Sequence, residues 1–206
     1  MTYITTQDPR TGITTQDPRF MAGTWDIDPN HSEVSFTVGH LVVGHLAISK
    51  VRGRFDAYNG TIVTDEDLSQ SSVSVTIDAA SVDSHLKIRD DQIRGPGFLD
   101  VDRFPNITFV SSTIRYEGGR YFVDGDLTIR DTTLPVTIGT TMNGFSPGSS
   151  GEMRVSFSAS TRINRLEFGV SYNSSIPGLD NAVNLSDDVL LTMDVEAILR
   201  KADPTN

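Results

Sequence analysis

Histidines are the side chains of this chain best suited to ligate a metal or to move a proton near neutral pH. His40 and His45 lie five residues apart around a short apolar stretch, and His31 lies one expected strand earlier. Metal-binding pairs usually lie three or four residues apart on a helix, or two apart on a strand, so this spacing is poor. Because the chain also has no cysteine, the sequence predicts no metal site. We expect His31 to form a hydrogen bond near a strand start, and His40 to lie where a ligand head group could reach it.

Arg89 and Asp90 form a second polar group, with Asp91 and Arg94 close by. One interpretation is a solvated helix face, whose ion pairs would contribute less than about 1 kcal/mol each. The other places Arg89 at the end of a ligand cavity, where its guanidinium would contact a hydroxyl, a quinone oxygen or a phosphate. Both interpretations stay open at this point.

The motifs of common enzyme classes are absent from the sequence. There is no Gly-x-Ser-x-Gly turn, no phosphate-binding loop and no Gly-x-Gly-x-x-Gly before a helix. Asp124 and Asp126 share one strand face, like the paired carboxylates of glycosidases, but no third group supports them. The sequence therefore predicts a protein that is not an enzyme and that needs no cofactor.

From Gly23 onward, apolar and polar residues alternate with a period of two, which is typical of β-strands with one buried face. Turn formers separate these runs, among them Gly118-Gly119 and Asn143-Gly144. An antiparallel sheet of about eight strands must close into a barrel or fold into a sandwich. The predicted strands cover residues 34–38, 51–63, 73–77, 107–115, 121–130, 134–141, 155–158 and 189–195.

Two segments break this alternation and are expected to be short helices over an open end of the sheet. They are residues 40–48, which are compact and apolar, and residues 84–94, which Gly95-Pro96-Gly97 would end. A net charge of -10 disfavours binding to nucleic acid and to anionic lipid surfaces. The sequence lacks both an apolar stretch long enough to span a membrane and a secretory leader, so we expect a cytoplasmic protein.

The first residues contain a heptapeptide twice, at Ile4–Arg10 and at Ile13–Arg19. One repeat of a short polar segment is too little for a solenoid. We therefore expect residues 1–22 to form a flexible N-terminal arm, residues 23–199 to form the folded domain, and residues 200–206 to form a C-terminal tail.

A series of motifs resembles the YceI-like family, in the same order and with compatible spacing. The motifs are Trp25-Asp26-Ile27-Asp28, the alternating run from His31 to His40, Gly53-x-Phe55 with Gly60, Ser81-Val82-Asp83-Ser84, Arg89-Asp90, Phe98-Leu99-Asp100, Phe104-Pro105-x-Ile107-x-Phe109, Gly125-Asp126-Leu127-Thr128-Ile129 and Asn164-Arg165-Leu166-Glu167-Phe168-Gly169. The resemblance runs from about Gly23 to Leu199. It is weakest at residues 170–181, which look longer and more polar than is typical of the family.

The resemblance implies an all-β fold, an eight-stranded antiparallel lipocalin-like barrel with one or two short helices near one end. It also implies an apolar interior that holds a long-chain isoprenoid lipid of polyprenyl or isoprenoid-quinone type, for sequestration or transport, and it implies that homodimers are common. The expected ligand-binding residues are Phe36, Val38, His40, Leu41, Val43, Leu46, Phe55, Arg89, Phe98, Phe104, Phe109, Phe157, Ile163 and Phe168.

Two other functions are compatible with the same barrel. One is an enzyme that acts on a lipid inside the cavity, with His40 or the Arg89-Asp90 pair as its reactive groups. The other is a structural or interaction module whose interior is packed shut and binds no ligand.

Overall fold

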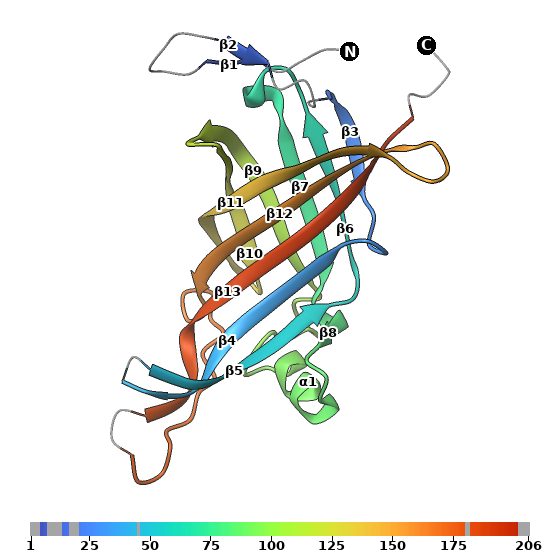
Figure 1. The fold of residues 1–206 in the computed structure, drawn as a ribbon. Helices are drawn as coiled ribbons and strands as arrows, with labels where there is room; N and C mark the ends of the chain where they lie inside the picture. The colour runs from blue at the N-terminus through green and yellow to red at the C-terminus, as the bar shows by residue number, and fades with distance from the viewer. Residues whose placement is uncertain (1–4, 8–13, 17–20, 45, 180–181, 202–206) are drawn as a thin grey trace.

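The chain folds into a closed antiparallel β-barrel, seen in a computed structural model that describes residues 5–7, 14–16, 21–44, 46–179 and 182–201 (Figure 1). Alternating apolar residues give each strand one face for the interior and one for solvent. The barrel strands are β3 (Gly23–Ile27), β4 (Glu33–Val43), β5 (Leu46–Phe55), β6 (Tyr58–Thr64), β7 (Ser72–Asp78), β9 (Asn106–Glu117), β10 (Arg120–Ile129), β11 (Thr132–Pro147), β12 (Met153–Asn164) and β13 (Ala182–Leu199).

The long strand β13 closes the barrel. One of its edges pairs with β12 over the whole length of that strand, from Arg154↔Ile198 to Asn164↔Asp188. Its other edge pairs first with β4 and then, at Ala197 and beyond, with β3. Since β3 with β4, and β5 with β6, each follow one bent path, the wall has eight strands, which confirms the predicted fold class.

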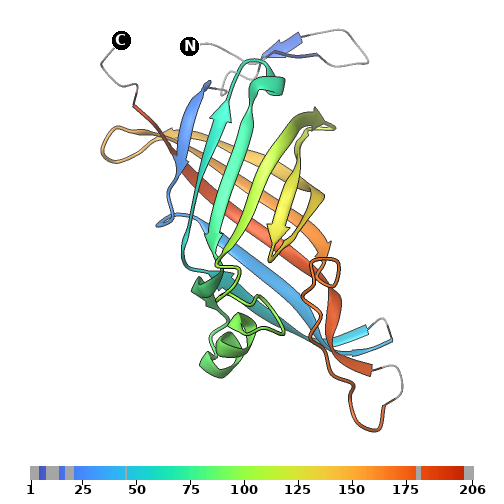
Figure 2. The same ribbon diagram turned by 180° about the vertical axis from the view of Figure 1, so that it is seen from behind.

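The short elements lie at the two ends of the barrel (Figures 1 and 2). The helix α1 (Lys87–Arg94) and the short strand β8 (Val82–Asp83) lie at one end, which we call the helix end. The start of β3 and the end of β13 lie at the opposite end, which we call the terminal end. Two turns of 3-10 helix complete the fold, η1 (Leu68–Gln70) at the terminal end and η2 (Ala79–Ser81) before β8.

An apolar cluster packs the barrel at the terminal end. Trp25 is fully buried there, and its Nε1 donates a hydrogen bond to Thr64 Oγ1 at 2.8 Å. Its ring packs against Phe145, with the ring centroids 5.4 Å apart. No helix of the described residues is long and apolar enough to cross a membrane.

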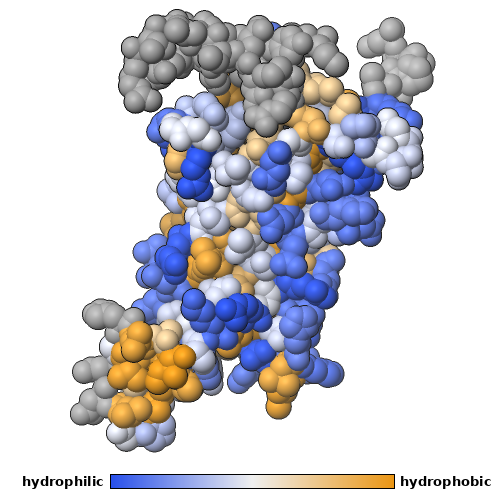
Figure 3. Space-filling model, viewed as in Figure 1, coloured by the Kyte–Doolittle hydropathy of each residue, from blue (hydrophilic) through white to orange (hydrophobic). Residues whose placement is uncertain are grey.

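The structure corrects the expectation of a helix at residues 40–48. This segment is the hairpin between β4 and β5, which turns at Gly44 with φ +60° and pairs Val43 with Leu46. Leu41 has a left-handed φ of 54°, so the strand alternation that would have revealed the hairpin is interrupted there. Leu46 and Ile48 are 72% and 67% exposed, and apolar atoms gather at this tip in Figure 3.

Two further expectations of local structure need correction. Asn143-Gly144 is not a turn, because β11 continues through it with a register shift against β12 between Met142 and Gly144, which marks a bulge. The second predicted helix exists, but it begins at Lys87 and not at residue 84, and its N-cap residue, Leu86, makes no side-chain cap hydrogen bond.

The two copies of the N-terminal repeat pair with each other. β1 (Thr5–Gln7) and β2 (Thr14–Gln16) form an antiparallel ladder that joins Thr5 to Gln16 and Gln7 to Thr14. The remainder of residues 1–20 lies outside the described part of the chain.

Gly125 marks a point where two strands approach closely. A Cβ atom there would lie 2.5 Å from the carbonyl oxygen of Val110 and 2.6 Å from the ring of Phe109, at the irregularity between β9 and β10. At Gly139 the nearest atom would be the flexible Arg120 guanidinium at 3.3 Å. We expect Gly125→Ala to lower the free energy of unfolding by about 1–3 kcal/mol and Gly139→Ala to change it much less, as measured by urea unfolding. Equal effects of the two variants would contradict this account.

Candidate functional site

The barrel encloses a cavity of about 480 Å³. It is lined by residues from η1 at the terminal end to α1 at the helix end, so it follows the length of the barrel. Ligand pockets usually measure about 300–1,000 Å³ and are mostly apolar. The interior is therefore partly empty rather than packed shut.

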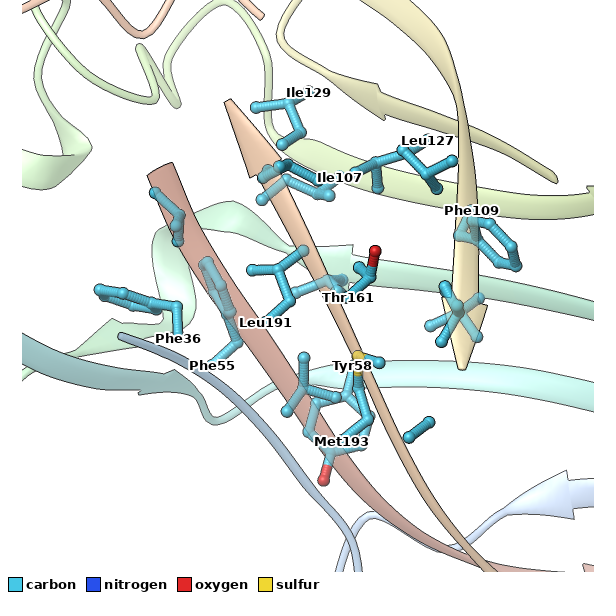
Figure 4. Close-up of a pocket in the computed structure, with 18 of the residues that line it drawn as sticks. Phe36, Phe55, Tyr58, Ile107, Phe109, Leu127, Ile129, Thr161, Leu191 and Met193 are labelled. Carbon is cyan, nitrogen blue, oxygen red and sulfur yellow. The ribbon is translucent and has the colours of Figure 1, made fainter. Parts of the chain in front are cut away.

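Inward strand positions supply the lining. On β12 every second residue faces the cavity, namely Phe157, Ala159, Thr161 and Ile163, and on β13 Val189, Leu191 and Met193 do the same. Figure 4 shows Leu191, Met193 and Thr161 among the lining side chains, with Leu191 beside Phe36, its partner on β4. Such a surface offers apolar contact along its length and few hydrogen-bond partners.

Most of the predicted ligand-binding residues line this one cavity. They are Phe36, Val38, His40, Phe55, Arg89, Phe98, Phe109, Phe157 and Ile163. They come from strands β4, β5, β9 and β12 and from the segment around α1, so the fold brings together residues that are far apart in the sequence.

Three predicted residues on the β4–β5 hairpin lie outside the lining. Val43 and Leu46 extend beyond the barrel wall and are 38% and 72% exposed. Leu41 is one residue out of phase with the inward positions Phe36, Val38 and His40, and it is not part of the lining. His45, considered above as a metal ligand, lies outside the described residues.

Two predicted aromatic residues are also outside the lining. Phe104 packs under two guanidinium groups, those of Arg103 at 4.8 Å and Arg130 at 5.6 Å from its ring centroid. Phe168 is 1% exposed and belongs to the apolar cluster around the cavity without facing it. Both side chains have well-packed surroundings, so their contribution is to the wall and not to its inner surface.

Arg89 and Asp90 separate into two structural roles, which corrects the interpretation of the whole group as a solvated face. Asp90 is 6% exposed and accepts hydrogen bonds from the backbone N–H and the hydroxyl of Ser84. Arg89 lines the cavity, and its Nε and Nη2 donate to the same residue, at 2.7 Å to Ser84 Oγ and 2.6 Å to Ser84 O. Asp91 and Arg94 form an ion pair with each other at the surface, and Asp91 also pairs with Lys87.

Arg165 is a cavity-lining cation that the sequence analysis did not single out. It is 5% exposed, and its Nε donates to Ser186 O at 2.8 Å. Its Nη1 donates to the carbonyl oxygens of Val170 and Tyr172, at 2.6 and 2.9 Å. Its position follows the inward alternation of β12, two residues after Ile163, but a charged side chain is not expected on an apolar inward face.

A group of possible metal ligands lies elsewhere, at the turn between β3 and β4. Asp28, His31 and Glu196 each bring one donor atom within 4.8 Å of the others. The guanidinium of Arg154 already lies between the two carboxylates, donating to Asp28 Oδ2 at 3.0 Å and to Glu196. His31 Nδ1 is 2.8 Å from Asp28 Oδ2, which is the hydrogen bond near a strand start that the sequence predicted. The two carboxylates of the donor set are thus already bridged by an arginine within the chain.

Asp124, one of the two carboxylates considered for glycosidase chemistry, is engaged on the outer wall. Asp124 accepts hydrogen bonds from Arg115 at 2.7 Å and from Thr137 at 2.6 Å. The Arg115 and Thr137 hydrogen bonds hold the pKa of Asp124 below its usual value, which is unsuitable for a general acid at neutral pH. Asp124 therefore stabilises the junction of β9, β10 and β11.

Asp28 gives a testable pH dependence. Burial raises its pKa, but hydrogen bonds from His31, Asn30 N–H and Arg154 outweigh that effect and leave the pKa lowered from 3.8. A carboxyl group whose pKa is lower in the folded than in the unfolded protein stabilises the fold at pH values above its unfolded-state pKa. This stabilisation is lost as the pH falls through the folded-state pKa. We expect Asp28→Asn to lower the free energy of unfolding by about 1–3 kcal/mol at pH 7. The difference from wild type should shrink below pH 4, as followed by urea unfolding at several pH values; a constant difference would contradict it.

Comparisons with known proteins agree with the fold and its cavity. A family model described as the YceI-like domain matches residues 25–197. Protein YceI of Salmonella newport is 33% identical over 147 residues, which cover 71% of this chain and 74% of that protein. A UPF0312 protein of Vibrio vulnificus is 32% identical over 142 residues, covering 68% and 72%.

Solved structures show the same architecture. The crystal structure of BcnA of Burkholderia cenocepacia superposes with a TM-score of 0.67 at 26% identity, covering 82% of this chain and 98% of BcnA. A domain from Saccharophagus degradans, described as polyisoprenoid-binding, superposes with a TM-score of 0.58 at 12% identity, covering 87% and 100%. At that identity the second likeness concerns the fold alone.

Proposed function

Because the chain belongs to the YceI-like family, we propose that its barrel binds a long-chain isoprenoid lipid, of polyprenyl or isoprenoid-quinone type, and does so without enzymatic turnover. The observation that carries the proposal is the apolar cavity of about 480 Å³ along the barrel. The description of the Saccharophagus degradans domain of the same fold as polyisoprenoid-binding supports this choice of ligand class.

Apolar burial alone provides enough free energy for retention of such a ligand. Each buried methylene group stabilises a complex by about 0.8 kcal/mol, so a few isoprene units exceed the ordering cost of association. The aromatic and branched side chains of the lining contact a tail without requiring a fixed register. We therefore expect the tail to supply the affinity, while the ends of the cavity decide which lipids are accepted.

Purification without added ligand tests the proposal directly. We expect native mass spectrometry of the purified protein to show a bound species, and solvent extraction to release an isoprenoid lipid. Recovery of a chemically altered lipid after incubation would instead support the enzyme. A ligand-free protein that also takes up no isoprenoid probe, neutral or anionic, would support the structural module and overturn the proposal.

Val38 gives a test of the cavity with a matched control. Its side chain is buried and faces the lumen from the middle of β4, whereas the neighbouring Thr37 is not part of the lining. We expect Val38→Trp to shorten the longest isoprenoid alcohol that is retained, because the indole occupies space needed by the tail. Thr37→Trp should leave the accepted length unchanged in the same retention assay. If both variants fold and retain the same range of tails, the lining is assigned wrongly.

A role in transport, homodimer formation and a cytoplasmic location stay predictions of the sequence analysis. Each has a direct measurement: transfer of a lipid between vesicles, the mass in solution, and localisation of the tagged protein in its host.

A further inference from the structure

The formal charges that face the cavity have one sign. The protein has 27 acidic and 17 basic residues, yet the described lining contains Arg89 and Arg165 and neither Asp, Glu nor Lys. A cavity lined at random in so acidic a chain would more often contain carboxylates. The interior is therefore electropositive although the molecule as a whole is strongly anionic.

Both arginines lie at the helix end and are linked through the same segments. Arg89 belongs to α1, and Phe98, which follows α1, packs its ring against Tyr172 at 5.0 Å between centroids. The N–H of Tyr172 donates to Gly97 O at 3.1 Å, while its carbonyl oxygen accepts from Arg165. Gln92 and Tyr172 add neutral polar groups to the lining of this end.

His40 also reaches this end of the cavity. It is next to Gly39, whose N–H donates to Ser186 Oγ at 2.9 Å, and the carbonyl oxygen of Ser186 accepts from Arg165 Nε. The polar lining at the helix end thus combines two cations with groups that can donate hydrogen bonds.

Neither of these two arginines has a close carboxylate partner among the described residues. Arg165 Nη2 is buried without a hydrogen-bond partner in the described chain, and the nearest carboxylate oxygen, Asp187 Oδ1, is 3.8 Å away. Arg89 bonds only to the hydroxyl and carbonyl oxygens of Ser84, and no described carboxylate forms an ion pair with it. Burial lowers the pKa of Arg165, and attraction by Asp187 opposes this effect. A buried guanidinium of this kind is stabilised by an anionic oxygen.

We propose that the bound lipid carries an anionic head group, a phosphate or a carboxylate, and that it lies at the helix end between Arg89 and Arg165. This inference rests on the proposed function, because the tail must occupy the barrel for its head to reach this position. It narrows the ligand class to prenyl phosphates and isoprenoid acids and away from neutral quinones and alcohols.

Three probes that share the same tail separate the contribution of the head group to the affinity from that of the tail. Geranylgeranyl diphosphate, geranylgeranoic acid and geranylgeraniol are each titrated into the full-length, solvent-extracted protein by calorimetry below their micelle concentrations. We expect one or both anionic probes to bind about tenfold or more tightly than the alcohol, since hydrogen bonds to charged groups are the stronger ones. The tighter of the two anions distinguishes a phosphate from a carboxylate ligand.

Variants assign the preference to the two arginines. Arg89→Gln and Arg165→Gln should each reduce the advantage of the anionic probes and leave the affinity for geranylgeraniol within about twofold, a change of under half a kcal/mol. Arg162→Gln removes the same charge from a position on β12 that lies outside the lining, and it should change neither affinity. Arg165 also donates hydrogen bonds to three carbonyl oxygens, so the Arg165→Gln variant can fail to fold. In that case the affinities of Arg89→Gln alone test whether the arginines bind the head group.

The outcomes distinguish the two proposals. Equal binding of the three probes by the wild type would overturn the anionic head group and leave lipid binding intact. Failure of all three to bind would overturn lipid binding itself. A preference for the anions that persists in both arginine variants would show that the head group lies elsewhere.

Discussion

Closure of the sheet by β13 is the constraint on which the remaining structure depends. This strand pairs with β12 along one edge and with β4 and β3 along the other, so no long edge is left open between the first and last parts of the barrel. A closed sheet fixes a radius, and the side chains that point inward either fill the resulting space or leave it free. Here the described lining leaves about 480 Å³ free.

The barrel wall separates two electrostatic environments, the outer surface and the cavity. Acidic side chains such as Asp124 and Asp26 lie on the outer surface, where arginines pair with them and water screens them. Inside the barrel, where most of the described lining is apolar, a charge without a partner is costly. The presence of two arginines and no carboxylate in the described lining is therefore more informative about the interior than the net charge of the chain, which describes mainly the exterior.

The sequence was sufficient to predict the strands of the barrel wall and many of the residues that line the cavity. Alternation places Phe36, Val38 and His40 on one face, and the structure confirms that they face the cavity together. The eight-stranded closure, however, came from the family resemblance, because periodicity does not distinguish a barrel from a sandwich. The hairpin at residues 40–48 shows the limit of alternation, since its apolar residues do not follow a period of two although they form paired strands.

Arg165 was missed for a different physical reason. A charged residue at an inward position contradicts the rule that strand interiors are apolar, so alternation alone suggests that the strand has ended there. The structure shows that three backbone carbonyl oxygens hold the guanidinium in place after β12 ends at Asn164. The carbonyls of Val170 and Tyr172 lie in the segment between β12 and β13, and that of Ser186 lies in β13 where its pairing with β4 is irregular, so their approach to one another is decided only by the closed barrel. The residue proposed to contact the lipid head group thus depends on tertiary contacts that the pattern of a single strand does not contain.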